Sequence, residues 1–593
     1  MSDLNTMRHS AAHLLAAAIF ELYPTAKFGV GPVVDDGFYY DMLLPEALSE
    51  EALVKVEAKM REIQARDEKF VREEMSIDQA IEFFASKNQD FKVELLKDLK
   101  EKGTTMKGAE VAEGSEGEVK TASIYSTGSF VDLCRGPHVE STKEICPFKL
   151  TKVAGAYWRG DEKNPQLQRV YGIAFETQEE LEKYLVMLEE AKKRDHKILG
   201  PALDLFTFSD LVGPGLPLWT PRGTILRNLL DEFVWSLRKK HSYMKVEIPH
   251  ITKKDLYITS GHWEKYKDDL FKITTREGHE FAMKPMNCPH HTQIFARQLW
   301  SYREMPQRYA NTTTCYRDEQ SGELSGISRT RAFSQDDAHV FCRMNQAKEE
   351  FLKIWDIVHE FYPVFGFNLR VRLSSHDPAH PEKYLGGQEN WAFAEGVLRE
   401  IIDEKKVDWF EGVGEAAFYG PKLDFMAKDA IGREWQVATI QLDMNMPERF
   451  DLVCINEKGE KERIVMIHAA IMGSIERFLS ILIEHVAGAF PMWLAPTQIR
   501  LATVGADFVP FAKELLVKLE TAGLRVDLDD TDEKVGKKIR SSAMMKIPWT
   551  IVVGAKEVEG GDFKINVFGQ EEDLIVPVGE LVPKAIEAGK ISR

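Results

Sequence analysis

Residues 315–339, CYRDEQSGELSGISRTRAFSQDDAH, constrain the fold of this chain more than any other stretch. Arg317 and Glu319 are two residues apart, so on an extended strand their side chains point to the same face. A polar loop with glycines follows at residues 321–328, and the stretch closes at the same period of two on Gln335, Asp337 and His339. The pattern predicts a strand–loop–strand hairpin with one charged face.

The side chains of this hairpin suit a nucleotide held beside a second, amine-bearing substrate. A guanidinium binds phosphate bidentately, which fits Arg317, Arg329 and Arg331. A carboxylate such as Glu319 can accept a hydrogen bond from an exocyclic amine, and the ring of Phe333 can stack on a base. An ordinary β-hairpin with a solvated charged tip would show the same pattern, so distant stretches must decide between the two interpretations.

Composition is typical of a large globular protein in a reducing compartment. The 593 residues are enough for several domains, and 44% hydrophobic with 29% charged residues is normal for such a chain. No apolar run approaches the roughly 18 residues that span a membrane, and Asp3, His9 and His13 are unlike a signal peptide. Six scattered cysteines argue against a disulfide framework. We therefore expect a cytoplasmic protein without a membrane segment.

The net charge of −17 is not typical of a nucleic-acid-binding protein, because such proteins usually carry a basic surface. Binding contacts are local, however, and basic clusters occur at residues 192–194, 238–240 and 534–540. Each cluster is also typical of a solvated helix face. Charge alone leaves the question open.

Periodicity divides the chain into four parts. Residues 1–175 mix helices and strands, with a helix expected at residues 6–22 and an exposed acidic loop at residues 110–120. Residues 176–199 are strongly helical, acidic first and basic last as the helix dipole favours, and Leu199-Gly-Pro is expected to end this connecting helix. Residues 200–494 form the largest part. Alternating strands and helices in residues 495–593 predict a small α/β module with a mostly parallel sheet.

The largest part is expected to begin with a turn and an amphipathic helix at residues 223–240. The strands expected there are residues 245–249, 280–285, 368–373, 416–426, 433–442 and 464–468. Residues 473–478 then open an apolar helix. Gly473 would let a ligand approach and Arg477 in the first turn would meet an anion, although helix packing and a surface ion pair explain these residues equally well.

Histidine and cysteine spacing predicts a polar cluster near the amino terminus. His9 and His13 lie four residues apart and share one face of the expected helix. Cys134 and His138 have the same spacing, but the Gly-Pro pair between them favours a loop. Three histidines and a cysteine could form a tetrahedral zinc site, whereas the helix lacks the glutamate of a metalloprotease motif. A structural histidine pair also remains open.

Together these stretches resemble the threonyl-tRNA synthetase family of class II aminoacyl-tRNA synthetases, over nearly the whole chain. The runs that carry the resemblance are HSAAHLLA, DLCRGPH, MKPMNCP, RDEQSGELSGISRTRAFSQDDAH, FYGPKLDF, WQVATIQLD, IHAAIMGSIERF and LAPTQI. The family's amino-terminal ubiquitin-like domain is not expected here. The resemblance implies an α+β multidomain protein: an α/β editing domain (1–175), the connecting helix (176–199), a class II catalytic domain with a mainly antiparallel sheet (200–494), and an α/β anticodon-binding domain (495–593).

The resemblance also implies an activity, in which L-threonine is activated with ATP to threonyl-adenylate and transferred to tRNA(Thr). Arg317 would hold the α-phosphate, Glu319 the adenine amine, and Phe333 would stack on adenine. Arg329 and Arg477 would bind the outer phosphates or the other face of the ring. Gln436 and Thr439 complete the implied ATP site, and Mg²⁺ accompanies ATP. Catalysis of this kind is mostly positioning, so no protein nucleophile is expected; the implied catalytic residues are Arg317, Arg477 and Lys422.

The implied metal site explains how threonine would be selected. Cys288, His339 and His468 match the family's ligands for one Zn²⁺ per subunit, with coordination left open for substrate. An apolar pocket discriminates valine from threonine only on the order of a hundredfold. A metal that binds both the amino group and the hydroxyl would reject valine, which lacks the hydroxyl. The implied threonine pocket comprises Gln335, Asp337, Tyr419, Lys422, Gln436, Gln441 and Ser474.

Serine keeps the hydroxyl, and losing one methyl group is worth only about 1–3 kcal/mol. The resemblance accordingly implies a second site that hydrolyses seryl-tRNA by activating water without a metal. Its residues would be His9, His13, Asp132, Cys134 and His138.

Some positions depart from the family pattern. Ala469 stands where arginine is usual, and His290 stands where glycine is common. Arg540 and Glu559 match anticodon-contacting positions, but Asp532 and Phe568 do not match the expected residues. Residues 223–249 match the class II dimer-interface motif, which implies a homodimer. A synthetase-derived RNA-binding regulator and an editing-only hydrolase are the rival interpretations.

Overall fold

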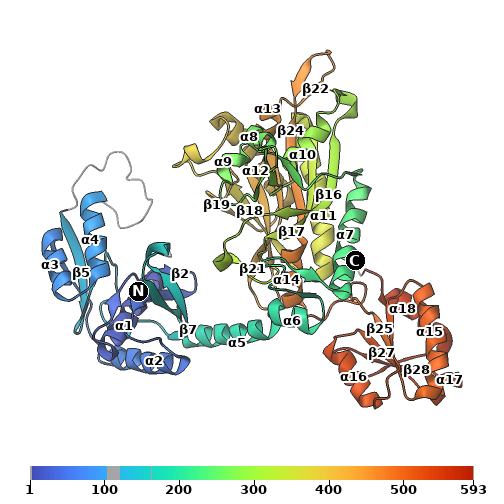
Figure 1. The fold of residues 1–593 in the computed structure, drawn as a ribbon, viewed down its shortest axis with the longest axis horizontal. Helices are drawn as coiled ribbons and strands as arrows, with labels where there is room; N and C mark the ends of the chain where they lie inside the picture. Colours follow the sequence, from blue (N-terminus) through green and yellow to red (C-terminus); the bar gives the residue numbers. More distant parts are fainter. Residues whose placement is uncertain (1–2, 103–119, 162, 592–593) are drawn as a thin grey trace. The chain divides into compact units, whose positions relative to one another are not determined.

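The computed structural model describes residues 3–102, 120–161 and 163–591. The chain divides into two compact units, Met1–Glu189 and Glu190–Arg593 (Figure 1). The division falls inside the expected connecting helix. The expected acidic loop at residues 110–120 lies outside the described residues, apart from its last residue. Among the described residues, no helix has both the length and the apolar character that crossing a membrane requires.

The first unit contains two antiparallel sheets. The larger has the order β1-β3-β8-β7, with β2 added to β3; its strands are β1 (Lys27–Phe28), β2 (Val33–Val34), β3 (Gly37–Leu43), β7 (Phe148–Tyr157) and β8 (Gln166–Ala174). The smaller has the order β4-β5-β6; its strands are β4 (Val71–Ser76), β5 (Thr121–Thr127) and β6 (Phe130–Leu133). The helices are α1 (Leu4–Leu22), α2 (Glu50–Ala65), α3 (Ile77–Ser86) and α4 (Asp90–Lys102).

Helix α1 is the centre of the first unit because its middle is small and apolar. Residues 10–19 are all buried, and Asp3 caps the helix by accepting a hydrogen bond from the Thr6 N–H. The helix packs against α2 and β3. His9 and His13 therefore point into the unit; His13 is buried and His9 is half-buried.

The second unit is built around an eight-stranded sheet. Its order is β11 (Met244–Lys245), β16 (Gln307–Tyr316), β17 (Ala332–Cys342), β24 (Val465–Ser474), β21 (Glu434–Asp443), β20 (Lys422–Lys428), β18 (Asn368–Ser375) and β19 (Trp409–Val413). Only the outer pairs β11–β16 and β18–β19 are parallel. The mainly antiparallel sheet of the expected catalytic part, and with it the α+β multidomain class, is confirmed.

Helices pack around this sheet and fill its core. The connecting segment consists of α5 (Gln178–Arg194), most of which belongs to the first unit, and α6 (His196–Ala202). The other helices of the second unit before its carboxy-terminal module are α7 (Pro221–Lys240), α8 (Lys254–Ser260), α9 (His262–Lys265), α10 (Cys288–Phe295), α11 (Ala347–Phe361), α12 (Gln388–Lys405), α13 (Asn445–Arg449) and α14 (Ile475–His485). Short strands form three satellite sheets: β9 (Phe206–Thr207) with β10 (Leu218–Trp219), β12 (Ile251–Lys253) with β13 (Lys272–Thr274) and β14 (Glu280–Met283), and β15 (Trp300–Ser301) with β22 (Val453–Ile455) and β23 (Lys461–Arg463).

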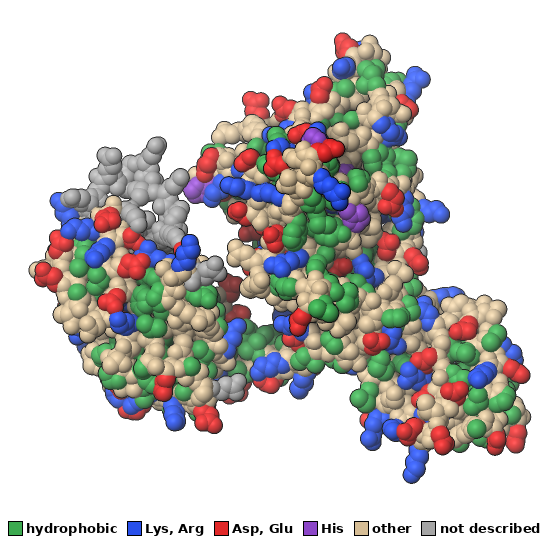
Figure 2. Space-filling view, in the orientation of Figure 1, with side chains coloured by type: hydrophobic (Ala, Val, Ile, Leu, Met, Phe, Trp, Pro, Cys, Tyr) green, Lys and Arg blue, Asp and Glu red, His purple; other side chains and the backbone are tan. Residues whose placement is uncertain are grey.

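The carboxy-terminal module alternates strands and helices as expected. Its elements are β25 (Ile499–Thr503), α15 (Val509–Thr521), β26 (Val526–Asp529), α16 (Val535–Met544), β27 (Trp549–Val553), α17 (Ala555–Val558), β28 (Phe563–Val567), β29 (Leu574–Val576) and α18 (Leu581–Ala588). The sheet order is β26-β25-β27-β28-β29, in which the first three strands are parallel and the last two are antiparallel additions. On the face drawn in Figure 2, acidic and basic side chains are interspersed and form no single basic patch.

Four local expectations are wrong. The connecting helix does not end at Leu199; it breaks at Asp195, and α6 continues through Pro201. Of the strand expected at residues 245–249, only Lys245 lies in a strand, the two-residue β11. Residues 416–421 form a turn before β20 rather than its first half. Finally, β16 ends at Tyr316, so Arg317 and Glu319 lie in the loop and not on one strand face.

Candidate functional site

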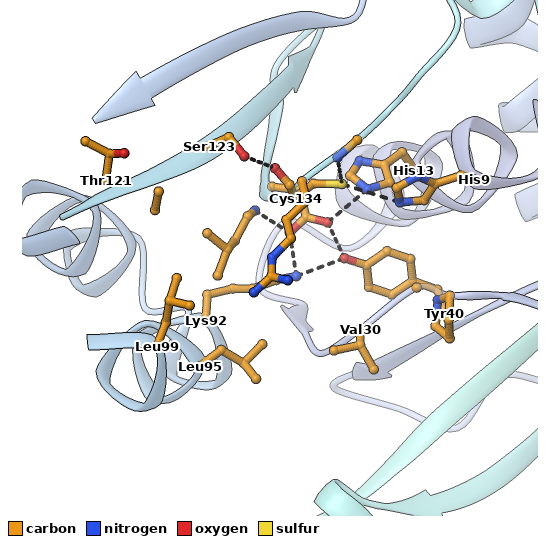
Figure 3. Close-up of a pocket in the computed structure, with 17 residues that line it drawn as sticks. His9, His13, Val30, Tyr40, Lys92, Leu95, Leu99, Thr121, Ser123 and Cys134 are labelled. Carbon is orange, nitrogen blue, oxygen red and sulfur yellow. Dashed lines mark hydrogen bonds and ion pairs between the residues drawn. The ribbon is translucent and has the colours of Figure 1, made fainter. Parts of the chain in front are cut away.

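The five residues predicted near the amino terminus meet in one place. Helix α1 supplies His9 and His13, and the loop after β6 supplies Cys134 (Figure 3). Strand β6 supplies Asp132, and His138 follows in the same loop. One ligand atom from each histidine and from the cysteine lies within 4.8 Å of the others. The Gly-Pro peptide bond in the loop is cis. The cluster lies at the edge of the small sheet, against α1.

Hydrogen bonds assign the tautomers of two histidines in this cluster. The Nδ1 of His9 lies 3.2 Å from the Pro137 carbonyl oxygen, which can only accept, so Nδ1 carries the hydrogen. The Nδ1 of His138 lies 3.1 Å from the Ser10 hydroxyl, which donates its own hydrogen to a backbone carbonyl. Both rings therefore present a bare Nε2 to Cys134 Sγ, at 3.4 and 3.3 Å.

The carboxylate of Asp132 is held by two residues that the sequence did not single out. Lys92 Nζ lies 2.5 Å from Oδ1, and the Tyr40 hydroxyl donates to Oδ2. Lys92 also donates to the Tyr40 hydroxyl at 3.1 Å, and His13 Nε2 lies 3.6 Å from Oδ2. Lys92 and Asp132 are only 3% and 2% exposed, so their charges compensate each other in the interior.

These groups line one wall of a cavity of about 640 Å³. Val30, Leu95 and Leu99 line its other side, and the polar cluster points inward from α1 and β6 (Figure 3). The cavity thus combines an apolar wall with several proton acceptors, the usual composition of a small-molecule site.

Burial keeps the three imidazoles and the thiol of the cluster uncharged at neutral pH. It lowers the pKa of His138 to about 2, lowers that of His9, and holds that of His13 well below the usual histidine value. Burial also raises the pKa of the Cys134 thiol to about 11. The cluster therefore presents neutral imidazoles and a protonated thiol, not a thiolate nucleophile.

A second cluster lies on the large sheet of the other unit. His339 on β17 and His468 on β24 are directly paired across the two strands, and Cys288 begins α10 above them. The donor atoms of the three residues lie within 4.8 Å of one another, and His339 Nε2 is 3.1 Å from His468 Nδ1. That spacing is compatible with two nitrogens bound to one ion at about 2.0–2.1 Å each. The donor set, two imidazoles and a thiol, fits Zn²⁺.

The outer nitrogens of both histidines have partners, as metal-binding histidines usually do. His468 Nε2 lies 2.9 Å from a carboxylate oxygen of Asp443, and His339 Nδ1 lies 2.7 Å from Nδ1 of His291. These contacts leave His468 Nδ1 and His339 Nε2 facing the cluster. The sequence did not identify Asp443 or His291, although His291 lies three residues after Cys288.

A buried lysine, Lys284, orients the threonine-pocket residues of β17 through Asn287. Lys284 can only donate, and its Nζ lies 3.1 Å from Asn287 Oδ1. The Asn287 amide nitrogen must then face the other way, and it lies 3.0 Å from Asp337 Oδ2 and 3.5 Å from Gln335 Oε1. Gln335, Asp337 and His339 thus share one strand face, as the period of two predicted.

The predicted adenine and phosphate ligands lie at the loop end of the β16–β17 hairpin. The Arg317 guanidinium carbon is 5.2 Å from the Phe333 ring centroid and 5.9 Å from that of Tyr266. Glu319 and Arg329 pair with each other, with Arg329 Nε 2.7 Å from a carboxylate oxygen. The structure therefore brings these four predicted residues together, with Tyr266 as an aromatic neighbour that the sequence analysis missed.

Three further predicted residues converge on Asp424, which is fully buried. Its oxygens accept hydrogen bonds from Gln436 and Thr439, each at 2.8 Å, and lie 2.9 Å from Lys422 Nζ. Arg372 adds a further contact at 2.9 Å. Asp424 fixes these side chains in place and was not identified from the sequence.

The remaining predicted residues surround the same region. The Tyr419 ring lies 5.2 Å from that of His468, and Gln441 donates to the Gly420 carbonyl at 3.0 Å. Ser474 caps α14 by accepting from the Arg477 N–H at 3.2 Å, and the Arg477 guanidinium lies near the Trp435 ring.

The structure also shows the surroundings of the residues that depart from the family pattern and of the two predicted anticodon-contacting residues. His290 is buried, and neither ring nitrogen has a hydrogen-bond partner among the described residues. The Ala469 carbonyl accepts from Arg238. In the carboxy-terminal module, Arg540 on α16 and Glu559 after α17 are exposed, as is Asp532, while Phe568 packs near Lys546. Their roles stay predictions.

Comparison with known proteins identifies three family matches. Residues 271–486 match the tRNA synthetase class II core domain (G, H, P, S and T). Residues 122–171 match the threonyl and alanyl tRNA synthetase second additional domain, and residues 498–588 match an anticodon binding domain. Each match lies within one of the parts expected from the sequence.

Two relatives that match nearly the whole of this chain are both named threonine–tRNA ligase. The threonine–tRNA ligase of Porphyromonas gingivalis is 46% identical over 587 residues, which are 98% of this chain and 87% of that protein. That of Cytophaga hutchinsonii is 46% identical over 572 residues, 96% of this chain and 86% of the relative. A crystal structure described as the RNA binding domain of threonyl-tRNA synthetase from Cryptosporidium parvum has a TM-score of 0.64 at 35% identity, covering 67% of this chain and 99% of that one. A putative threonyl-tRNA synthetase from Aeropyrum pernix has a TM-score of 0.58 at 29% identity, covering 67% and 98%.

Proposed function

The chain belongs to the threonine–tRNA ligase family, and we propose that it activates L-threonine with ATP, transfers the threonyl group to tRNA(Thr), and hydrolyses seryl-tRNA(Thr) in its first unit. One observation supports the synthetic part most directly. A single strand, β17, carries the ring expected to stack on adenine, the carboxylate expected to receive the amine, and a histidine of the metal cluster. Nucleotide, amino acid and metal would therefore meet along about 20 Å of one strand.

The activation step is a displacement at the α-phosphate of ATP. A carboxylate oxygen of threonine forms a bond to that phosphorus, and the bond to the pyrophosphate oxygen breaks. Arg317 and Lys422 would stabilise the charge that develops on the phosphate oxygens, and Arg329 with Arg477 would hold the leaving pyrophosphate. For ATP to bind, Glu319 and Arg329 must exchange their mutual ion pair for contacts to adenine and phosphate.

Selection of threonine is assigned to the cluster of Cys288, His339 and His468. A bound Zn²⁺ would supply a Lewis acid with open positions for an amine and a hydroxyl. Asp337 is held by Asn287 through one oxygen, so its other oxygen can accept from the substrate ammonium. Tyr419, beside His468, closes the pocket over this face.

Hydrolysis of the seryl ester is assigned to the cavity of the first unit. Water would attack the ester carbonyl carbon, the bond to the ribose oxygen would break, and that oxygen would take up the proton. The Nε2 atoms of His9 and His138 carry no hydrogen and would accept the proton of the water. Lys92 and Tyr40 hold Asp132 so that it supports His13. No metal is required for this sequence of steps.

Amino-acid-dependent ATP–pyrophosphate exchange tests the synthetic part of the proposal. We expect strong exchange with threonine, weak exchange with serine and none with valine, and we expect zinc chelation to remove the threonine signal. Zinc-replete protein that exchanges with no amino acid would instead favour the RNA-binding regulator. Activity confined to seryl-tRNA hydrolysis would favour the editing-only hydrolase.

The assembly and location of the protein are also parts of this proposal. Helix α7 and β11, with Asp231 on the helix bonded to Thr312 of β16, would form the interface of a homodimer. Light scattering coupled to gel filtration should give twice the mass of the 67.6-kDa chain. Six free cysteines suit the reducing cytoplasm.

The editing reaction should be insensitive to mild acid. An ordinary histidine base, with a pKa near 6.5, would lose about fourfold of its neutral form between pH 7.5 and 6.0. Here burial lowers the pKa of His9, His13 and His138, so their neutral, proton-accepting forms persist as pH falls through this window. The rate of seryl-tRNA hydrolysis, corrected for spontaneous hydrolysis, should change less than about twofold. A fourfold fall would contradict the neutral cluster.

Replacement of His291 should weaken the metal site without touching a ligand. For His339 to offer Nε2, its Nδ1 must carry the hydrogen and donate it to Nδ1 of His291. His291→Leu removes that acceptor, and zinc affinity measured by chelator competition should fall about 10- to 100-fold. His291→Asn places an amide oxygen near the Nδ1 position and should retain most of the affinity. His290→Ala, at the neighbouring buried position, is the control and should leave zinc affinity unchanged.

A further inference from the structure

A third cluster of titratable residues lies against the loop of the predicted ATP site, where α6 meets α14. It comprises Asp195, His196 and Glu484, whose oxygen and nitrogen atoms lie within 4.8 Å of one another. His196 is 4% exposed. None of its three residues belongs to the metal cluster or lines the cavity of the first unit.

The cluster is not arranged to bind a metal, because its donor atoms are already used. His196 Nδ1 lies 2.6 Å from Glu484 Oε1, and His196 Nε2 accepts the Ile327 N–H at 3.3 Å. The other oxygen of Glu484 lies 2.6 Å from Arg433, which also pairs with Asp429. The imidazole is therefore fixed as the tautomer with hydrogen on Nδ1, a donor to one element and an acceptor from another.

The two bonds of His196 join elements that carry predicted ATP ligands. Ile327 lies at the tip of a tight hairpin in which Ser325 and Arg329 pair through their backbones. Arg329 is the residue assigned to the outer phosphates. Glu484 lies in the last turn of α14, the helix whose first turn carries Arg477. One side chain thus connects both arginines to α6.

Steric packing gives independent support for the contact. Gly326 has a φ of +51°, and a Cβ atom built on it would lie 2.3 Å from His196 Nε2. The loop backbone therefore rests directly on the imidazole, with no room for a side chain between them. Ile327 itself is fully buried in the main core, which anchors the loop tip on its other side.

We propose that His196 is a positioning residue that holds the 325–329 hairpin, and through it Arg329, in place to bind the outer phosphates of ATP. It touches no substrate and acts through Ile327 and Glu484. Because Asp195 and His196 directly follow α5, the residue also fixes where the connecting segment joins the ATP site. The inference rests on the proposed function only for the identity of the ligand.

Two substitutions separate the two bonds of the imidazole. His196→Asn places an amide nitrogen near the Nδ1 position and keeps the bond to Glu484 but loses the acceptor for Ile327. His196→Gln reaches the Nε2 position and keeps that acceptor. In threonine-dependent exchange we expect the KM for ATP to rise about tenfold in His196→Asn and about twofold or less in His196→Gln. The KM for threonine should stay within twofold in both.

Hydrogen–deuterium exchange of the peptide containing Ile327 gives a readout that needs no activity. The amide should lose protection in His196→Asn and keep it in His196→Gln. Gly326→Ala disturbs the same contact from the loop side and should also raise the KM for ATP, whereas Gly322→Ala, in the same loop with open space around it, should not. If His196→Asn does not fold, the comparison of Gly326→Ala with Gly322→Ala tests the proposal instead.

Unchanged ATP KM and unchanged Ile327 exchange in His196→Asn or Gly326→Ala would overturn the proposal. Absence of exchange activity in the unmodified protein would overturn the proposed function instead, while deuterium exchange would still report whether His196 holds the loop. The two failures are therefore distinguishable.

Discussion

Replacing Cys288 by alanine should abolish bound zinc and reduce threonine-dependent pyrophosphate exchange by about 10³-fold or more. Cys288 supplies the only sulfur of the cluster, and two histidines alone leave a bound ion with too few protein ligands for a stable site. Metal content by mass spectrometry and kcat/KM for threonine measure the two effects. The expected loss exceeds that of one hydrogen bond because the metal would contact both the amine and the hydroxyl of threonine.

Discrimination against valine is the sharper readout of the same substitution. A site that binds a substrate hydroxyl can reject the analogue without it by about 10⁴–10⁵, whereas an apolar pocket achieves on the order of 10². In Cys288→Ala we expect the threonine-to-valine ratio of kcat/KM to fall to about 10² or less. Cys342→Ala is the matched control, because Cys342 is buried on the same strand as His339 but lies outside the cluster. If the zinc-free Cys288→Ala protein still preferred threonine over valine by about 10⁴ in kcat/KM, the metal would not be what selects threonine.

The metal cluster shows what sequence alone could supply. Cys288, His339 and His468 were identified only through the resemblance, because they lie 51 and 129 residues apart along the chain. Their meeting depends on antiparallel pairing of β17 with β24, which no local pattern encodes. By contrast, the period of two along β17 predicted correctly that Gln335, Asp337 and His339 share a face, because strand geometry fixes that relation locally.

The same period failed for Arg317 and Glu319, for a local reason. Their segment is not extended: the Glu319 N–H donates to the Arg317 carbonyl two residues earlier, at 2.9 Å, which closes a tight turn after β16. Alternation of charged residues therefore predicts a shared face only where ladder hydrogen bonds continue. In this hairpin the last such bond runs from the Arg317 N–H to the Arg331 carbonyl, and Glu319 lies beyond it.

The supporting residues were the hardest to predict. Tyr40 and Lys92 hold Asp132 from β3 and α4, and Asp424 holds three side chains of the synthetic site. Neither Tyr40 nor Lys92 belongs to a recognised run, and within FYGPKLDF the spacing alone does not mark Asp424 as the residue that holds its neighbours. The structure reveals them, because a polar or charged side chain in the interior must be paired, and here the pairing partners are predicted site residues.

Replacing Cys134 by alanine should slow hydrolysis of seryl-tRNA(Thr) on the order of a hundredfold and leave threonine activation unchanged. The thiol lies between the bare nitrogens of His9 and His138 and is the group that both rings face. Its loss removes the hydrogen-bond partner that the Nε2 atoms of both rings share. The measurement is the decay of preformed seryl-tRNA(Thr) with catalytic amounts of protein, alongside threonine-dependent pyrophosphate exchange as the activity expected to persist.

Cys146→Ala provides the matched control for this experiment. Cys146 is a buried cysteine of the same unit that does not line the cavity, so the substitution tests general destabilisation by loss of a thiol. It should hydrolyse seryl-tRNA(Thr) at the unmodified rate. With serine and tRNA(Thr) supplied together, only Cys134→Ala should accumulate seryl-tRNA(Thr). Normal clearance by Cys134→Ala would place the hydrolytic site elsewhere, since no other group lies between the two imidazoles among the described contacts.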